Sequence, residues 1–159
     1  MAKNNYLSII TLKVNGLNAP IKRQRRPKWI RKHDPHICCL QETHLRTRDL
    51  HRLKVKGWKQ IFQANGQEKK AGVAILISDK IDFQRRAIKR DPEGHFKILK
   101  GRIHQEDINI GNIYAPNIGA PKYIKKIWED VKKDIDRKTI IVGDFNTPLS
   151  KMDLSLIHI

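Results

Sequence analysis

The sequence predicts a mixed fold of the α/β or α+β class. Short apolar or β-branched segments, bounded by turn residues, recur along its 159 residues and are typical of strands. Two longer segments carry helical signals, and strands with two packing helices indicate one of these two classes. No apolar run approaches the roughly 18 residues that a membrane-spanning helix needs, so no such span is expected.

The first half of the chain is expected to alternate strands with a basic helix. Residues 6–14 (YLSIITLKV) predict a strand that Asn15-Gly16 ends, and residues 21–33 predict a helix crowded with lysine and arginine. Because an interior proline costs about 3 kcal/mol, we expect that helix to kink or to begin afresh near Pro27. Further strands are expected at residues 37–41, 58–64 and 72–78.

The second half is expected to add four strands and one helix. The strands are predicted at residues 82–89, 96–103, 108–114 and 139–142. The turn Asp91-Pro92-Glu93-Gly94 lies between the first two and predicts a hairpin. Pro121 opens the clearest helix, because apolar residues recur at helical spacing from Ile124 to Ile135. The last strand, TIIV, is expected to be buried and to end at Gly143-Asp144.

Positive charge is the strongest feature of the composition. The 33 lysine and arginine residues outnumber the 16 acidic ones and give a net charge of +17. Such a field attracts polyanions such as DNA, RNA or acidic membrane surfaces. The N-terminus carries no secretory signal pattern, and the adjacent Cys38 and Cys39 would point to opposite faces of a strand. A reducing, intracellular compartment is therefore expected.

Polar groups follow three of the predicted strands directly, at Gln41–Thr43, Tyr114–Asn117 and Gly143–Asn146. Strand ends in a packed sheet are rigid platforms on which sites gather. Glu42 offers oxygen ligands to a hard cation, Asp144 can take a proton from water, and Asn146 can orient that water or a phosphate oxygen. With Tyr114 as a donor to phosphate, these residue types suit metal-assisted hydrolysis of a phosphodiester.

Each of these residues also has a plain structural interpretation. A glutamate after a strand, such as Glu42, is often a solvated turn residue. The Asp-x-Asn sequence at Asp144 is typical of turns, and Tyr114 can be a buried tyrosine with a satisfied hydroxyl. The seven histidines and two cysteines show no zinc-ligand spacing, so structural zinc is not expected.

Taken jointly, the motifs resemble the endonuclease/exonuclease/phosphatase superfamily, which includes exonuclease III and abasic-site endonucleases. Within it, the chain is similar to the N-terminal endonuclease domains of the second open reading frame proteins of mammalian long interspersed element retrotransposons. The resemblance runs from about residue 9 to about residue 150. It rests on VNGLNAPIKR, CCLQETHLRTRDLHRLKVKGW, QANGQEKKAGVAILISDK, IKRDPEGHF, NIYAPNIGAP and VGDFNTPLS.

The resemblance implies a role for each strand-end residue. Glu42 is then the ligand of Mg²⁺ or Mn²⁺, Tyr114 contacts the scissile phosphate, and Asp144 polarises or deprotonates the attacking water. Asn146 helps to place that water and, with Asn117, contributes to substrate binding.

The resemblance also implies a fold and an activity. The fold is an α/β sandwich of two packed sheets flanked by helices. The activity is nicking of an A/T-rich DNA duplex to leave a 3′-hydroxyl that primes reverse transcription, with target choice made through DNA shape. RNA is a further partner through basic charge, and no membrane partner or obligate oligomer is expected. The family acts in the nucleus and cytoplasm.

The first strand-end motif departs from the family at one position. Asn15 matches its second polar position and is a further candidate catalytic residue, but Lys13 stands where the family has an asparagine. A cation beside the metal would repel it by about 4 kcal/mol at about 4 Å and an effective dielectric constant of about 20. Alternatively, Lys13 pairs with Glu42 and replaces the ion. Both alternatives predict weakened magnesium binding.

The C-terminal part departs from the family pattern as well. The family domain needs roughly 80 further residues, with a Ser-Asp-His motif and a second essential aspartate, so an incomplete second sheet is expected. Residues 1–150 are assigned to the partial domain and residues 151–159 to a tail outside the pattern. Two interpretations of LSLIHI stay open: a translated sequencing adapter (CTGTCTCTTATACACATC in frame) or an ordinary apolar tail.

The leading hypothesis is therefore a magnesium-dependent DNA endonuclease by family, with this chain a catalytically impaired fragment. One alternative is a non-enzymatic basic fragment that binds nucleic acid, which steep salt dependence without magnesium dependence would support. The other is an active phosphoesterase of the same superfamily that acts on abasic DNA or another phosphoester.

Overall fold

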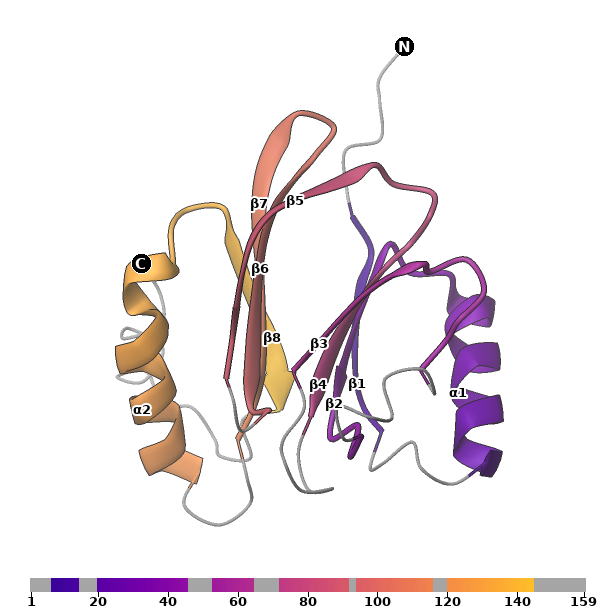
Figure 1. Ribbon diagram of the computed structural model, residues 1–159, viewed down its shortest axis with the longest axis horizontal. Helices are drawn as coiled ribbons and strands as arrows, with labels where there is room; N and C mark the ends of the chain where they lie inside the picture. Colours follow the sequence, from indigo (N-terminus) through magenta and orange to yellow (C-terminus); the bar gives the residue numbers. More distant parts are fainter. Residues whose placement is uncertain are drawn as a thin grey trace.

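Two β-sheets pack face to face, and one helix lies on the outer side of each (Figure 1). This computed structural model describes residues 7–14, 20–45, 53–64, 72–91, 94–115 and 120–144. The expected α/β sandwich of two sheets flanked by helices is thereby confirmed. Neither helix in these ranges is long and apolar enough to cross a membrane.

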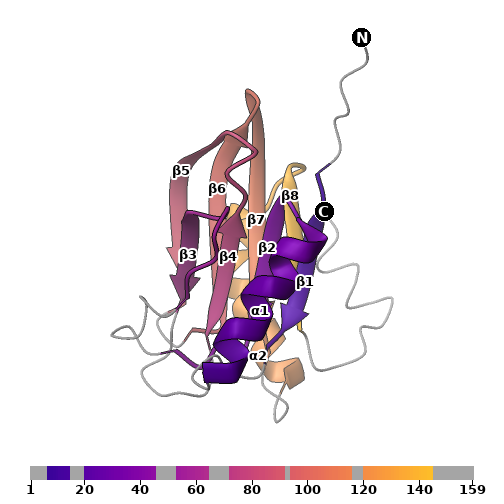
Figure 2. The same ribbon diagram turned by 90° about the vertical axis from the view of Figure 1, so that its right-hand side faces the viewer.

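The first sheet has the strand order β1-β2-β4-β3. β1 (Ile9–Lys13) pairs in parallel with β2 (Ile37–Gln41), and α1 (Pro20–His33) makes the long crossover that a parallel pair requires. β4 (Val73–Ile77) pairs antiparallel with β2 and with β3 (Gln60–Ala64). β2 and β4 are buried at every position, which explains their nearly continuous apolar sequences. Figure 2 shows α1 lying across this sheet.

The second sheet has the strand order β5-β6-β7-β8. β5 (Phe83–Arg90) and β6 (Phe96–Ile103) pair antiparallel, which confirms the hairpin expected at the Asp-Pro-Glu-Gly turn. β7 (Glu106–Tyr114) pairs antiparallel with β6 and in parallel with β8 (Thr139–Asp144). α2 (Ala120–Val131), followed by a 3₁₀ turn at Lys132–Asp134, makes the parallel crossover.

Apolar side chains fill the space between each pair of layers. Successive strand residues point to opposite faces, so Cys38 packs with the α1 side and Cys39 packs between the sheets. On the α2 side, Ile127 and Val131 pack against the outer face of the second sheet, as the helical spacing predicts. Because each strand must bury its apolar side chains on a given face, the register of the parallel pairs β1-β2 and β7-β8 is fixed.

The expected break in the basic helix is wrong, because α1 is one continuous helix with Pro27 inside it. A proline removes one backbone donor, but the rest of the hydrogen-bond ladder can continue on either side. Ile30 is fully buried against the first sheet, and Trp29 packs beside it. Full burial of a side chain such as Ile30 contributes about 1.5–3 kcal/mol, which is comparable to the cost of about 3 kcal/mol for Pro27.

The expectation of a buried strand at residues 139–142 is also wrong. Ile140 is 38% exposed, and its neighbours in β8 are half-buried. β8 lies at the edge of the described sheet, so one side of it lacks a neighbouring strand there. A short apolar run has the same sequence signal on an edge strand as on a central one.

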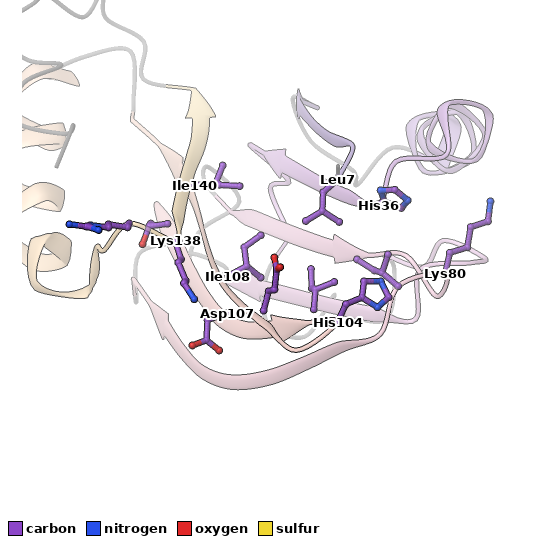
Figure 3. Close-up of a pocket in the computed structure, with 13 residues that line it drawn as sticks. Leu7, His36, Lys80, His104, Asp107, Ile108, Lys138 and Ile140 are labelled. Atoms are coloured by element: carbon purple, nitrogen blue, oxygen red, sulfur yellow. The ribbon is translucent and has the colours of Figure 1, made fainter. Parts of the chain in front are cut away.

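The carboxyl ends of the parallel strands β1, β2, β7 and β8 lie at one end of the sandwich (Figure 1), and a cavity of about 890 Å³ lies at the other. Figure 3 shows this cavity between the two sheets, with Leu7, Ile108 and Ile140 among its lining residues. In the parallel pairs, Lys13 lies opposite Gln41 and Tyr114 opposite Asp144. None of these four residues lines the cavity.

Lys97 of β6 carries a buried ammonium group that donates a hydrogen bond to Gln63 O at 2.6 Å. Burial, reinforced by the charges of Arg90 and Arg85, lowers its pKa from 10.5 to about 8. Between these two values the unfolded chain holds a proton that the folded chain has lost. The free energy of unfolding therefore rises as the pH increases from about 8 to 10.5.

Replacing Lys97 by Met is expected to remove this rise, because the ionisable group is gone, and to leave the protein no less stable at pH 7. Urea unfolding at several values between pH 7 and pH 10 measures it. Lys100→Met on the same strand is the matched control, since Lys100 instead pairs with Asp134 at 3.1 Å. Equal pH dependence in Lys97→Met and the unmodified protein would contradict the buried-ammonium account.

Candidate active site

Four of the side chains singled out in the sequence meet at the carboxyl ends of the two parallel strand pairs. Lys13 ends β1 and Asp144 ends β8, while Glu42 directly follows β2 and Tyr114 ends β7. The two sheets therefore contribute equally to the group. Asn15, Asn117 and Asn146 lie outside the described residues.

Lys13 bridges the two carboxylates of the site. Its Nζ lies 3.2 Å from Glu42 Oε2 and 3.4 Å from Asp144 Oδ2. The hydrogen bond to Glu42 and the charges of both carboxylates raise the pKa of Lys13, and partial burial opposes them. Lys13 therefore stays charged at neutral pH. The pairing with Glu42 that the sequence suggested is present.

Glu42 is buried, and its backbone has an unusual conformation. Its φ angle is +55°, and that of His44 is +56°. An L-residue held in this left-handed region costs of order 1–3 kcal/mol, so the surrounding contacts must impose it. The carboxylate accepts a hydrogen bond at Oε1 from the Tyr114 hydroxyl at 2.9 Å. His44 Nε2 lies 3.9 Å from the same oxygen.

Tyr114 is a neutral hydrogen-bond donor in this arrangement. Burial raises the pKa of its phenol well above 10, and the hydrogen bond to Glu42 and the charges of Glu42 and Asp144 raise it further. The hydroxyl therefore keeps its proton and orients the Glu42 carboxylate. This contact joins the first sheet to the second.

A buried amide pair lies directly beneath these groups. Gln41 Nε2 donates to Asn112 Oδ1 at 2.8 Å and to Thr11 Oγ1 at 2.8 Å. Asn112 Nδ2 in turn donates to Leu40 O at 3.0 Å and to Ala74 O at 2.8 Å. Asn112 is fully buried, so its bonds tie the second sheet to the backbone of the first.

A close backbone approach positions Asp144 at the end of β8. Gly143 has φ +151°, and a Cβ there would lie 1.9 Å from Ile113 O. Only glycine fits this contact without a shift of the β7 backbone. Glycine before Asp144 is therefore required by packing, in addition to being part of the sequence motif.

The site side chains that the structure describes do not fit a bound divalent ion. Two carboxylates suit a hard cation by their chemistry, but the Lys13 ammonium contacts both, and the Tyr114 hydroxyl uses a Glu42 oxygen. Within the described ranges, no cluster of three or more His, Cys, Asp or Glu side chains could hold a metal. The chain's own ammonium supplies the positive charge between the carboxylates.

The sequence interpretation missed Asn112 and His44. Asn112 stands alone between apolar neighbours in the segment IGNIY, and a polar residue in such a strand is a signal for a buried network. His44 follows Glu42 by two residues, but the left-handed conformation that turns it toward the carboxylate has no sequence signal.

Comparisons with known proteins agree on a family. A model of the Endonuclease/Exonuclease/phosphatase family matches residues 11–159. The Transposon TX1 uncharacterized 149 kDa protein of Xenopus laevis is 29% identical over 153 residues, which cover 92% of this chain and 12% of that protein. The expected resemblance to this superfamily and to a mobile-element protein is thereby confirmed.

Many solved structures share the fold, among them an AP endonuclease and a DNA-bound TDP2. An AP endonuclease from Archaeoglobus fulgidus has a TM-score of 0.63 at 21% identity, with 93% of this chain and 60% of that chain covered. TDP2 of D. rerio, in complex with a single strand DNA product, has a TM-score of 0.67 at 14% identity, with 94% and 64% covered. The chain therefore spans less than two thirds of each of these relatives.

Removing the amide of Asn112 is expected to destabilise the fold by about 3 kcal/mol, because the Asn112→Ala change leaves buried polar partners unsatisfied. Urea unfolding measures the loss. Asn109→Ala on the same strand is the control, since the Asn109 side chain bonds only at 3.2 and 3.4 Å to Asp136 and Thr139. An equal loss of unfolding free energy in Asn112→Ala and Asn109→Ala would show that the Asn112 bonds between the sheets do not stabilise the fold more than an ordinary side-chain contact.

Proposed function

Because the chain belongs to the endonuclease/exonuclease/phosphatase family, we propose that it is a DNA endonuclease domain whose own phosphodiester hydrolysis is suppressed. The observation that carries the proposal is the position of Lys13 Nζ, 3.2 Å from Glu42 and 3.4 Å from Asp144. Family membership supports the chemistry, and this contact supports the suppression.

DNA is the proposed substrate. A net charge of +17 favours a polyanion. The similarity to a transposon protein supports a role in a mobile element. We propose that this role is DNA nicking that leaves a 3′-hydroxyl to prime reverse transcription. The two similar solved structures, an AP endonuclease and a complex with a DNA product, support the same class of polymer. We propose an A/T-rich duplex as target, RNA as a further partner through charge, and action in the nucleus and cytoplasm.

The proposed roles of the side chains are those that the family resemblance implies. Asp144 is the proposed group that accepts a proton from the attacking water, and Tyr114 is the proposed neutral donor to the scissile phosphate. Asn15, Asn117 and Asn146 lie outside the described residues, and we propose them as further catalytic and substrate-binding groups on the family pattern alone. Glu42 is the proposed metal ligand of the family site.

Lys13 suppresses the proposed hydrolysis in this chain because its ammonium group takes the place of a metal ion. When bound, Mg²⁺ or Mn²⁺ would supply charge neutralisation and a more acidic water. In this chain Glu42 and Asp144 instead face an ammonium group that cannot acidify water. The proposed suppression follows from this substitution of a side-chain cation for an ion.

Non-enzymatic nucleic-acid binding is the second candidate function, and the same Lys13 contact favours it. A suppressed domain keeps its basic surface, so binding is expected to weaken steeply with salt and to be insensitive to a chelator. Binding of a labelled duplex at several salt concentrations, with and without chelator, separates this property from turnover.

Nicking of supercoiled plasmid tests the main proposal. With magnesium, the unmodified chain is expected to nick no faster than Glu42→Ala. Lys13→Asn removes the ammonium and is expected to raise magnesium-dependent nicking on the order of a hundredfold, the scale of one well-placed electrostatic group. The Lys13→Asn, Glu42→Ala double variant should lose that gain.

Lys13→Arg is the matched control, because it keeps a cation between the carboxylates and should stay inactive. Magnesium-dependent nicking by the unmodified chain that Glu42→Ala abolishes would refute the suppression. Equal inactivity of Lys13→Asn and Lys13→Arg would contradict the proposal that Lys13 alone suppresses nicking.

A further inference from the structure

A cluster of three polar side chains lies behind Tyr114, at the turn between β5 and β6. The Asp91 carboxylate accepts a hydrogen bond from the His95 backbone N–H at 3.1 Å and lies 3.2 Å from His95 Nδ1. Tyr123 of α2 donates to the same carboxylate at 3.3 Å, and its oxygen lies 2.7 Å from His95 Nδ1. The imidazole is thus fixed from the turn and from α2.

The fixed imidazole stacks on the ring of Tyr114. The two ring planes are 6° apart and their centroids are 6.0 Å apart, which is an offset parallel stack. The Tyr114 backbone N–H also donates to His95 O at 2.7 Å. One residue therefore holds both the backbone and the ring of Tyr114, whose hydroxyl reaches Glu42 at 2.9 Å.

The same turn also supports the backbone next to Glu42. Gly94 O accepts from the Gly72 N–H at 3.0 Å, and Gly72 O accepts from the Thr43 N–H at 3.1 Å. Gly72 has φ +114°, and a Cβ there would lie 2.2 Å from Thr43 Oγ1, so glycine is required for this approach. The turn is thus connected to both partners of the Tyr114–Glu42 hydrogen bond.

We propose that His95 is a positioning residue for Tyr114. Its ring, held by Asp91 and Tyr123, packs against one face of the Tyr114 ring, hinders the motion of that ring and so keeps the hydroxyl within reach of Glu42. The relevance to catalysis rests on the proposed function of Tyr114 as the donor to phosphate. The positioning itself is a property of the protein without metal or DNA.

Nuclear magnetic resonance of ring-labelled tyrosine tests the proposal directly. The chain has three tyrosines, so the Tyr114 signals can be assigned by their loss in Tyr114→Phe. His95→Gln removes the stacked ring and keeps a polar side chain, whereas His95→Phe keeps a flat ring and removes the polar contacts. We expect ring flipping and hydroxyl exchange of Tyr114 to speed up about fivefold in His95→Gln and to stay near the original rates in His95→Phe.

His33→Gln is the matched control, because His33 lies on α1, on the far side of the first sheet (Figure 1). Unchanged rates in His95→Gln, or equal acceleration in the Phe and Gln variants, would overturn the proposal. Nicking assays in the Lys13→Asn background are separate. Failure of those assays with the expected ring rates would refute the proposed function and leave the positioning role intact.

Discussion

The geometry of the site depends on one buried side chain that ties the two sheets together. Asn112 of the second sheet bonds to the first at Leu40 O, Ala74 O and the Gln41 amide. Each buried polar group left without a partner costs about 1–3 kcal/mol, so the sheets cannot slide past each other cheaply. Glu42 follows Gln41 by one residue and Tyr114 follows Asn112 by two. The register that Asn112 sets therefore brings their side chains together.

The charge balance of the site follows from that register. Two carboxylates, one from each sheet, approach a common point, and their mutual repulsion must be relieved by a positive charge. Lys13 reaches that point from β1 and contacts both. In this chain the relieving cation is covalently attached and always present. Under the proposed function, a family site that takes an exchangeable ion is here a closed ion triad.

The sequence predicts most of this architecture, because it rests on local patterns. The strand segments, the hairpin at Asp91 and the apolar face of α2 follow from periodicity and turn residues. The contact of Lys13 with Glu42 is predicted through the family resemblance alone, because the two residues lie far apart in the sequence and no local pattern brings them together. The continuity of α1 through Pro27 and the exposure of Ile140 depend on packing partners far along the chain. The stack of His95 on Tyr114 likewise has no local signal.

Calorimetric titration of Mg²⁺ into the unmodified chain, Lys13→Asn and Lys13→Arg tests the central claim, that Lys13 replaces an ion, most directly. Removing a like charge from the neighbourhood of the carboxylates should strengthen binding by at least about tenfold in Lys13→Asn alone. The unmodified chain and Lys13→Arg should bind equally weakly. Equal magnesium affinities in all three proteins would contradict the claim.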